Sequence, residues 1–173
     1  MSIQKHLNLG CGNNIIKTAW NVDILKGVGV DEIYDLRRTP WKWKSKSIDK
    51  IYLRHALEHF EKPNHIIKEC HRILKVGGLC EICVPHSTSP SAIGCLGHYR
   101  TYSYNTLNDY LSRPFYVFRK QLFKTTKQRI IWQPGYEWTP IQWLIDLSPR
   151  VFERFWWAYV GGAYEIQWTG KKI

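Results

Sequence analysis

The sequence predicts an α/β fold whose sheet is mostly parallel, and two observations carry this prediction. Between residues 50 and 84 a strand, a helix and a further strand follow one another. The second of these strands is an almost continuous apolar run, which is typical of a parallel strand covered on both faces. With 173 residues the chain is long enough for one core, and we expect a single domain over residues 1–173.

The spacing of apolar residues and the positions of glycine and proline predict the elements of the first half. We expect strands at residues 6–9, about 20–24, about 30–36, 50–53 and 79–84. The clearest helix begins at Pro63 and is stopped by Gly77 and Gly78. Only about ten residues separate Gly10 from Trp20, and residues 25–29 alone separate the second strand from the third. A crossover helix needs about a dozen residues or more, so the first two helices are expected to be shortened.

The second half shows weaker patterns. We expect a helix at 104–111, a sixth strand at 115–123, an aromatic-rich amphipathic helix at 149–159 and a last strand at 164–168. The helix at 149–159 carries Phe152, Phe155, Trp156 and Trp157. Core packing is the interpretation that we favour for these aromatic side chains, and the alternative is a helix on a membrane surface or a partner.

The chain is basic, with a formal net charge of +11. Residues 110–136 contain no acidic residue, and basic and aromatic side chains alternate over residues 113–132. This segment suits RNA or another polyanion, because basic groups bind phosphates and aromatic rings stack on bases. A solvated strand whose aromatic side chains belong to the core explains the same pattern equally well.

No run of 18 or more apolar residues is present, and the start of the chain lacks the apolar core of a signal peptide. We therefore expect a soluble, cytoplasmic protein without a transmembrane segment. Its five cysteines are expected to be reduced and buried. Cys80 and Cys83 have a metal-like spacing, but they lie on a predicted strand and no second pair exists, so we expect no zinc ribbon.

The residues from His55 to His59 spell H-x-x-E-H, which is a signature of zinc proteases. Such a site needs both histidines on one long helix. Here His55 comes two residues after a predicted strand, and Pro63 follows four residues after His59. We therefore expect no metal, and we expect Glu58 and His59 to orient the loop through hydrogen bonds.

Gly10 and Gly12 follow the first predicted strand, where the backbone can approach a ligand closely. The dinucleotide fingerprint is incomplete, because Ile15 replaces its third glycine and Asp23 follows Gly12 by only eleven residues. Asp23 ends the second strand and could accept hydrogen bonds from a ribose diol. Asp35 could border an adenine, or it could cap a turn.

Several motifs in order resemble a compact class I S-adenosylmethionine-dependent methyltransferase of the type 11 kind. They span roughly residues 5–105 and are Asn8-Leu-Gly-Cys-Gly-Asn13, Asn21-Val-Asp23, Asp35-Leu36, Ile48-Asp-Lys-Ile51, Ala56-Leu-Glu-His59, Arg72-Ile-Leu-Lys-Val-Gly-Gly78 and Val84-Pro-His86. The resemblance implies a Rossmann-like, mostly parallel sheet of seven strands whose last strand is antiparallel. It divides the domain into a cofactor-binding half, residues 1–86, and a substrate-side half, residues 87–173. Val76 departs from the family, which usually has proline there.

The resemblance also implies a cofactor, S-adenosylmethionine, and its product S-adenosylhomocysteine. Asp23 would bind the ribose hydroxyls, Gly10 and Gly12 would lie against the methionine part, and His55 would line the pocket. The full set of cofactor-binding residues is expected to be Asn8, Leu9, Gly10, Gly12, Asp23, Asp35, Leu36 and His55. No metal is implied.

Methyl transfer to a hydroxyl or an amine can need a base, and histidine is the usual one near neutral pH. We expect His86, His98 and Tyr102 as catalytic residues and Arg100 as a substrate-binding residue, although each could be an ordinary loop residue. The function predicted is a methyltransferase that acts by in-line displacement on an unidentified acceptor. The alternative is a nucleic-acid or membrane-surface binding module on a catalytically degraded fold. The Trp-rich final third could also form a homodimer.

Overall fold

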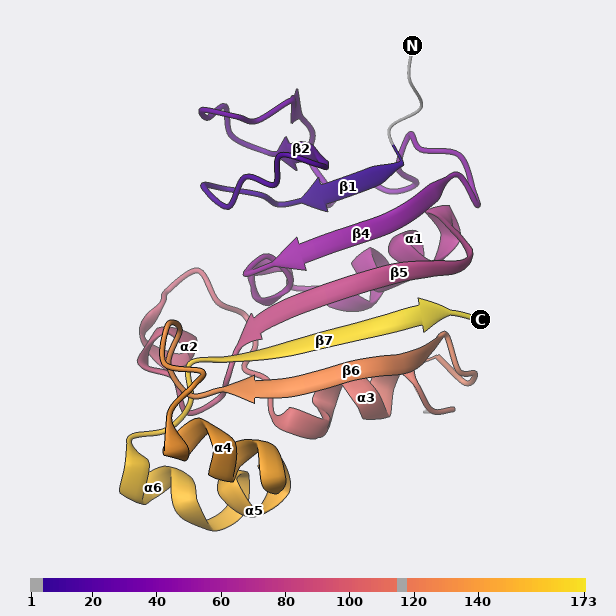
Figure 1. Cartoon of the computed structure of the whole chain (residues 1–173). Helices are drawn as coiled ribbons and strands as arrows, with labels where there is room; N and C mark the ends of the chain where they lie inside the picture. The colour runs from indigo at the N-terminus through magenta and orange to yellow at the C-terminus, as the bar shows by residue number, and fades with distance from the viewer. Residues whose placement is uncertain (1–4, 115–117) are drawn as a thin grey trace.

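A computed structural model describes residues 5–114 and 118–173. They form one sheet of seven strands in the order β3-β2-β1-β4-β5-β7-β6 (Figure 1). The strands are β1 (His6–Leu9), β2 (Trp20–Asp23), β3 (Glu32–Ile33), β4 (Ile48–Arg54), β5 (Leu74–Pro85), β6 (Phe123–Ile131) and β7 (Glu165–Lys172).

The sheet is mixed. All pairs among β1 to β5 are parallel, whereas β7 runs antiparallel to both of its neighbours, β5 and β6. A mostly parallel sheet of seven strands with an antiparallel last strand is therefore confirmed. The third strand is shorter than predicted, because only two of residues 30–36 pair with β2.

The helical segments are distributed unevenly around the sheet. They are η1 (Leu57–His59), α1 (Pro63–Ile73), α2 (Pro90–Gly94), α3 (Tyr104–Leu111), α4 (Pro140–Leu147), α5 (Pro149–Val151), the π-helical η2 (Phe152–Trp156) and α6 (Trp157–Val160). Figure 1 shows α1 and α3 behind the sheet, and α4 to α6 together beyond the edge strand β6. The main core lies between the sheet and α1 and α3, and a second, smaller cluster lies under α4 and η2.

The first helix ends earlier than predicted. Its last residue is Ile73, and Leu74 already belongs to β5, where it pairs with Ile48 and is fully buried. Burial of this side chain in the sheet therefore decides the boundary, rather than the two glycines. Gly78 lies inside the strand, where an added Cβ would come within 3.0 Å of the carbonyl oxygen of Asp49.

The N-terminal connections contain no helix at all over residues 10–47, so the expected helices are replaced by loops rather than shortened. Buried amides hold these loops. The Nδ2 of Asn8 donates to the carbonyl oxygen of Asn14 and to the Oδ1 of Asn21, and the Nδ2 of Asn21 donates to the carbonyl oxygens of Ile16 and Ala19. Side-chain amides thus satisfy backbone groups that a helix would have satisfied itself.

The C-terminal half corrects two further predictions. The sixth strand begins at Phe123 instead of ending there; residues 118–122 form no strand, and residues 115–117 lie outside the described residues. Because β6 is an edge strand with mostly polar residues, its sequence lacks the apolar pattern that indicates a strand. The short helix α4 was not predicted, although Pro140 stands in its first turn and the side chain of Thr139 caps it.

The aromatic helix was predicted in the right place, but its core packing was wrong. Residues 149–160 are helical throughout, and Phe152 is buried. In contrast, Phe155, Trp156 and Trp157 are 63%, 57% and 42% exposed. No other described element covers enough of this helix to bury its outer face.

Candidate functional site

A cavity of about 430 Å³ lies at the carboxyl ends of β1, β2 and β4. Six of the eight residues predicted to bind a cofactor line it, namely Gly10, Gly12, Asp23, Asp35, Leu36 and His55. We call this the glycine-loop cavity. The structure brings these residues together because parallel strands present their carboxyl ends at one edge of the sheet.

The two glycines shape this cavity in different ways. Gly10 has φ +65°, and an added Cβ would come within 2.8 Å of the Cβ of Ala56. Gly12 has φ +47°, and an added Cβ there would meet nothing within 4 Å. Gly10 therefore allows the loop to pack closely against the segment after β4, while Gly12 keeps the wall of the cavity open.

The carboxylate of Asp23 is held at the mouth of the cavity. Its Oδ2 accepts a hydrogen bond from the backbone N–H of Gly12 at 2.7 Å, and its Oδ1 accepts one from Leu25 at 3.0 Å. Each carboxylate oxygen can accept two hydrogen bonds, so capacity remains for a ligand.

Asp35 also caps its own turn. Its Oδ1 accepts from the backbone N–H of Arg37 and from the Nε of the same residue, at 3.0 and 2.8 Å. These hydrogen bonds from Arg37 lower the pKa of Asp35. The turn-capping reading is therefore met in the structure, and Asp35 lines the glycine-loop cavity as well.

The other two predicted cofactor residues do not line the cavity. Asn8 and Leu9 are fully buried, and the amide of Asn8 contacts the loop that follows β1. They stabilise the base of the glycine loop from within the buried sheet. Tyr34 and Phe60, which the sequence did not single out, also line the cavity, as does His59, for which only a loop-orienting role was expected. Their position just after strand ends was the available signal for them.

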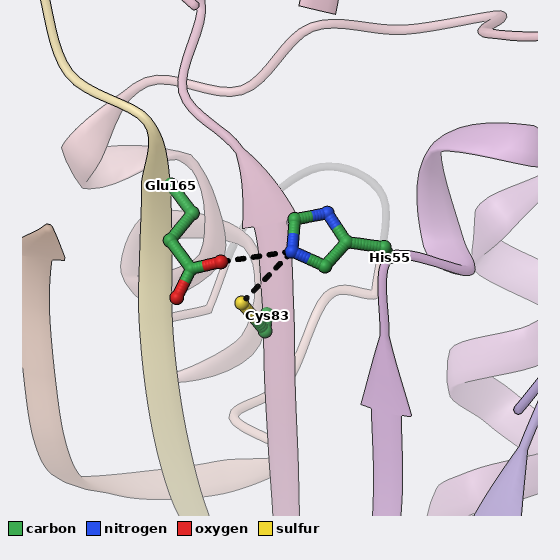
Figure 2. A group of neighbouring side chains, drawn as sticks. All are labelled: His55, Cys83 and Glu165. Atoms are coloured by element: carbon green, nitrogen blue, oxygen red, sulfur yellow. Dashed lines mark hydrogen bonds and ion pairs between the residues drawn. The ribbon is translucent and has the colours of Figure 1, made fainter. Parts of the chain in front are cut away.

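His55 stands between the glycine-loop cavity and a second cavity of about 430 Å³ on the sheet. Its φ is +51°, and its Nε2 lies 2.8 Å from Glu165 Oε2 and 3.7 Å from Cys83 Sγ (Figure 2). These hydrogen-bond contacts with Cys83 and Glu165 raise the pKa of His55 well above its ordinary value. Burial raises the pKa of Cys83 to about 11, so Glu165 is the anionic partner at neutral pH. A separation of 110 residues kept Glu165 out of the sequence prediction.

The residues predicted for the acceptor side do not all line one cavity, although the backbones of His86 and Tyr102 pair with each other. His86 is fully buried, with Nδ1 2.8 Å from Thr88 Oγ1 and Nε2 3.1 Å from Glu153 Oε1, so it connects β5 to η2. Tyr102 and Arg100 line a third cavity of about 740 Å³ between α1 and α3. Burial raises the pKa of Tyr102. The catalytic roles of His86, His98 and Tyr102 and the substrate role of Arg100 stay predictions.

The H-x-x-E-H motif does not lie on a long helix, since η1 has three residues. The Nδ1 of His59 contacts the carbonyl oxygen of Gly97 at 3.0 Å, so it orients the loop as expected. The expectation for Glu58 is wrong: its carboxylate is buried, and neither oxygen has a hydrogen-bond partner among the described residues.

The described part of the basic aromatic segment 113–132 offers few exposed rings, and Phe115 and Tyr116 lie outside the described residues. Phe123 is fully buried, Phe118 is partly buried against the main core, and Trp132 donates from Nε1 to the carbonyl oxygen of Val160. Two basic side chains are paired, Arg113 with Asp109 and Arg129 with Asp146. RNA binding by this segment stays a prediction.

The described chain has no helical segment whose length and apolar character would let it span a membrane.

Residues 7–82 match the family model for the methyltransferase domain. No curated protein matches the chain.

Solved structures share the fold over nearly the whole chain. A S-adenosylmethionine-dependent methyltransferase from Archaeoglobus fulgidus is 14% identical, with a TM-score of 0.67 and coverage of 99% of this chain and 87% of that one. A putative methyltransferase in a complex with the Trm112 activator from Haloferax volcanii is 15% identical, with a TM-score of 0.61 and coverage of 98% and 82%.

A third structure contains the product of the cofactor. It is the 1,6-didemethyltoxoflavin-N1-methyltransferase from Burkholderia thailandensis with bound 1,6-didemethyltoxoflavin and S-adenosylhomocysteine. It is 12% identical, with a TM-score of 0.59 and coverage of 96% of this chain and 70% of that one. At these identities the likeness shows a common fold.

Proposed function

We propose that the protein transfers a methyl group from S-adenosylmethionine to an acceptor, because residues 7–82 match the family model for the methyltransferase domain and the chain shares its fold with S-adenosylmethionine-dependent methyltransferases. The glycine-loop cavity carries the proposal. It lies where open α/β sheets bind ligands, at the carboxyl ends of the strands.

The residues of this cavity fit the cofactor. Gly12 leaves open space where any other side chain would stand, and the Asp23 carboxylate is fixed beside it by two backbone N–H groups. We propose that Asp23 holds the ribose hydroxyls and that Gly10 and Gly12 border the methionine part. The rim formed by Asp35 and Leu36 would border the adenine, with His55 as the opposite wall. When bound, the cofactor supplies a methyl group on a sulfonium.

The contribution of the chain is mainly positional. Holding a ligand rigidly against an acceptor can supply about 7–11 kcal/mol of barrier reduction without a covalent enzyme intermediate. The glycine loop is held rigidly, because Gly10 N–H and Cys11 N–H both donate to the Val22 carbonyl oxygen, at 2.8 and 3.1 Å, and fix the loop on β2. The acceptor would approach from the side of Tyr102 and Arg100, whose cavity opens between α1 and α3.

Mass spectrometry of the purified protein for bound cofactor, followed by a methyl-release assay against RNA, lipid and metabolite pools, tests the proposal. We expect S-adenosylmethionine or its product in the protein and methyl release with one of the pools. Protein that neither carries nor binds either compound would contradict the proposal.

A cytoplasmic location belongs to the same proposal, since all five cysteines are free and four of them are buried.

A second candidate function is binding to a membrane surface, and the exposed aromatic face of α4 to α6 favours it. We define this face by the exposed residues Trp138, Trp143, Leu144, Leu147, Val151, Phe155, Trp156, Trp157 and Tyr159. Two of the acidic groups nearby are engaged, because Glu153 contacts His86 and Asp146 pairs with Arg129, while Glu137 is exposed beside Trp138. Arg150 and Arg154 remain exposed beside the aromatic rings, which is the composition of a helix that lies on an anionic lipid surface.

Cosedimentation with vesicles of anionic and of neutral lipid tests the second candidate. We expect binding to the anionic vesicles that falls when Trp156 and Trp157 are both replaced by serine, while Tyr99→Ser, an exposed aromatic residue elsewhere, leaves binding unchanged. Equal recovery in the supernatant for both lipid types would contradict it. A dimer in light scattering that the double variant abolishes would instead assign the face to a second copy.

A further inference from the structure

We propose that Glu58, His59 and His98 form a binding site for a divalent metal ion. One ligand atom from each of these side chains lies within 4.8 Å of the ligand atoms of the other two. Two imidazoles and one carboxylate therefore converge from two segments, η1 and the loop that follows α2. The inference is separate from methyl transfer and does not depend on it.

Polar atoms that lack partners point to a ligand here. Glu58 is 1% exposed, and neither of its carboxylate oxygens has a hydrogen-bond partner among the described residues. The Nδ1 of His98 is also buried without one. The nearest cation to Glu58 is His55, whose Nδ1 lies 3.5 Å from Oε1, beyond a good hydrogen bond. Buried polar groups are normally satisfied, and a metal ion between the two segments would satisfy both.

The hydrogen bonding of His59 is that of a metal ligand. Its Nδ1 contacts the carbonyl oxygen of Gly97 at 3.0 Å, which requires the proton on Nδ1 and leaves Nε2 with a free lone pair. Ligating histidines commonly donate their other N–H to a backbone carbonyl in this way. The rings of His59 and His98 lie 4.6 Å apart in an edge-to-face arrangement.

The backbone holds the two segments together. The N–H of Tyr99, next to His98, donates to the carbonyl oxygen of Glu58 at 2.9 Å. The loop that carries His98 is therefore fastened to η1 whether or not an ion is bound. This geometry differs from that of the zinc proteases, since His55 is not among the three ligands and no long helix is involved.

A second group, His55, Cys83 and Glu165, is also close enough to hold an ion (Figure 2). It is satisfied without one. The Nε2 of His55 lies 2.8 Å from Glu165, and the sulfur of Cys83 lies 3.7 Å from the same nitrogen. Neither this carboxylate nor this imidazole lacks a partner, so this group serves as the internal control.

The ligand set selects the class of ion. Two imidazoles with one carboxylate suit Zn²⁺, Co²⁺, Ni²⁺ or Fe²⁺, whereas Mg²⁺ and Ca²⁺ prefer oxygen ligands alone. Three protein ligands leave at least one position open for water or another molecule. Because His59 also lines the glycine-loop cavity, the ion would stand at its rim.

Titration of untagged, chelator-treated protein with Zn²⁺ and with Co²⁺, followed by calorimetry and by the Co²⁺ absorption spectrum, tests the site. We expect one ion per chain and a cobalt spectrum without an intense thiolate charge-transfer band. The variants Glu58→Gln and His98→Gln should each weaken binding at least about tenfold. The control variant Cys83→Ser should leave affinity unchanged.

His98 lies in a partly exposed loop, and circular dichroism of His98→Gln checks that its fold is retained. Binding that is lost in Cys83→Ser but kept in His98→Gln would overturn the proposal in favour of the second group. Absence of stoichiometric binding to the wild-type protein would overturn it outright. Both readouts are independent of methyl transfer, so failure of the proposed function would not affect them.

Discussion

The two ends of this molecule differ in how their connecting segments are stabilised. Around the glycine-loop cavity, loops replace the crossover helices, and buried polar side chains such as Asn8, Asn21 and Glu69 hold those loops by hydrogen bonds. At α4 to α6 the helices are present, but most of their aromatic side chains remain exposed. The first region has loops where helices were expected, and buried polar side chains hold those loops, whereas the second has helices whose aromatic face no described residue covers.

Among the changes around the glycine-loop cavity, the largest effect is expected at the tightest point of the glycine loop. Gly10→Ala should lower the free energy of unfolding by about 2–5 kcal/mol, because it combines a left-handed backbone with a clash against Ala56. Gly12→Ala, where the added Cβ meets nothing, should cost about 1–2 kcal/mol from the backbone alone. Urea denaturation measures both, and equal losses would mean that the close approach at Gly10 is not a constraint.

The next effect concerns the amides that replace helical hydrogen bonds. Asn21→Ala should cost about 2–4 kcal/mol, because it removes the buried hydrogen bonds that Asn21 makes with Asn8 and with the backbone of Ile16 and Ala19. Asn64→Ala, at an exposed position in α1, should stay within about 0.5 kcal/mol. If thermal denaturation gives the same small change for both, the loops do not depend on buried amides.

Glu69 is a charged side chain that also holds one of the N-terminal loops by hydrogen bonds. Its Oε2 accepts from the N–H of Trp41 at 2.6 Å, and Arg72 donates to both of its oxygens. Hydrogen bonds from Arg72 lower the pKa of Glu69, so its contribution is present above the ordinary value near 4.5 and is lost as pH falls below it. Glu69→Gln should cost about 1–3 kcal/mol at pH 7 and less at pH 3.

The exposed pair Asp49 and Lys75 is the control for this charge. Asp49→Asn should change stability by about 1 kcal/mol or less. Denaturation at pH 7 and pH 3 separates the two variants. A Glu69→Gln variant with the same loss at both pH values would show that the charge of Glu69 contributes nothing.

The smallest effect on stability is expected at the other end of the molecule. Replacing Trp156 and Trp157 by serine should change the free energy of unfolding by about 0.5 kcal/mol or less per site, because both rings are largely exposed. Phe152→Ala should cost about 3–5 kcal/mol, because that ring is buried in the same helical stretch. Equal, large losses in thermal denaturation would mean that the aromatic face is packed in solution.

The sequence located what depends on local patterns. The strand at 6–9, the helix at 104–111 and the close grouping of Gly10, Gly12 and Asp23 agree with the structure. It failed where distant contacts decide. Leu74 joins a strand because Ile48 is its neighbour, and Glu165 meets His55 only because β7 lies next to β5.

The exposed aromatic face could not be predicted because a helical stripe of aromatic residues looks the same whether it is covered or not. The sequence also assigned Glu58 a hydrogen-bonding role that the structure does not provide. The aromatic face is not covered by any described residue, and the Glu58 carboxylate has only the 3.5 Å contact with His55 Nδ1. Such groups are the ones that the further experiments address.

Calorimetric titration with S-adenosylhomocysteine tests the central claim, that the glycine-loop cavity binds the cofactor through Asp23. We predict one binding site per chain in the wild-type protein and in Asp109→Ala, an acidic residue paired with Arg113 on α3. Asp23→Ala should weaken binding at least about tenfold, because it removes charged hydrogen bonds worth about 1.5–3 kcal/mol each. Unchanged affinity in Asp23→Ala, or no binding to the wild-type protein, would contradict the claim.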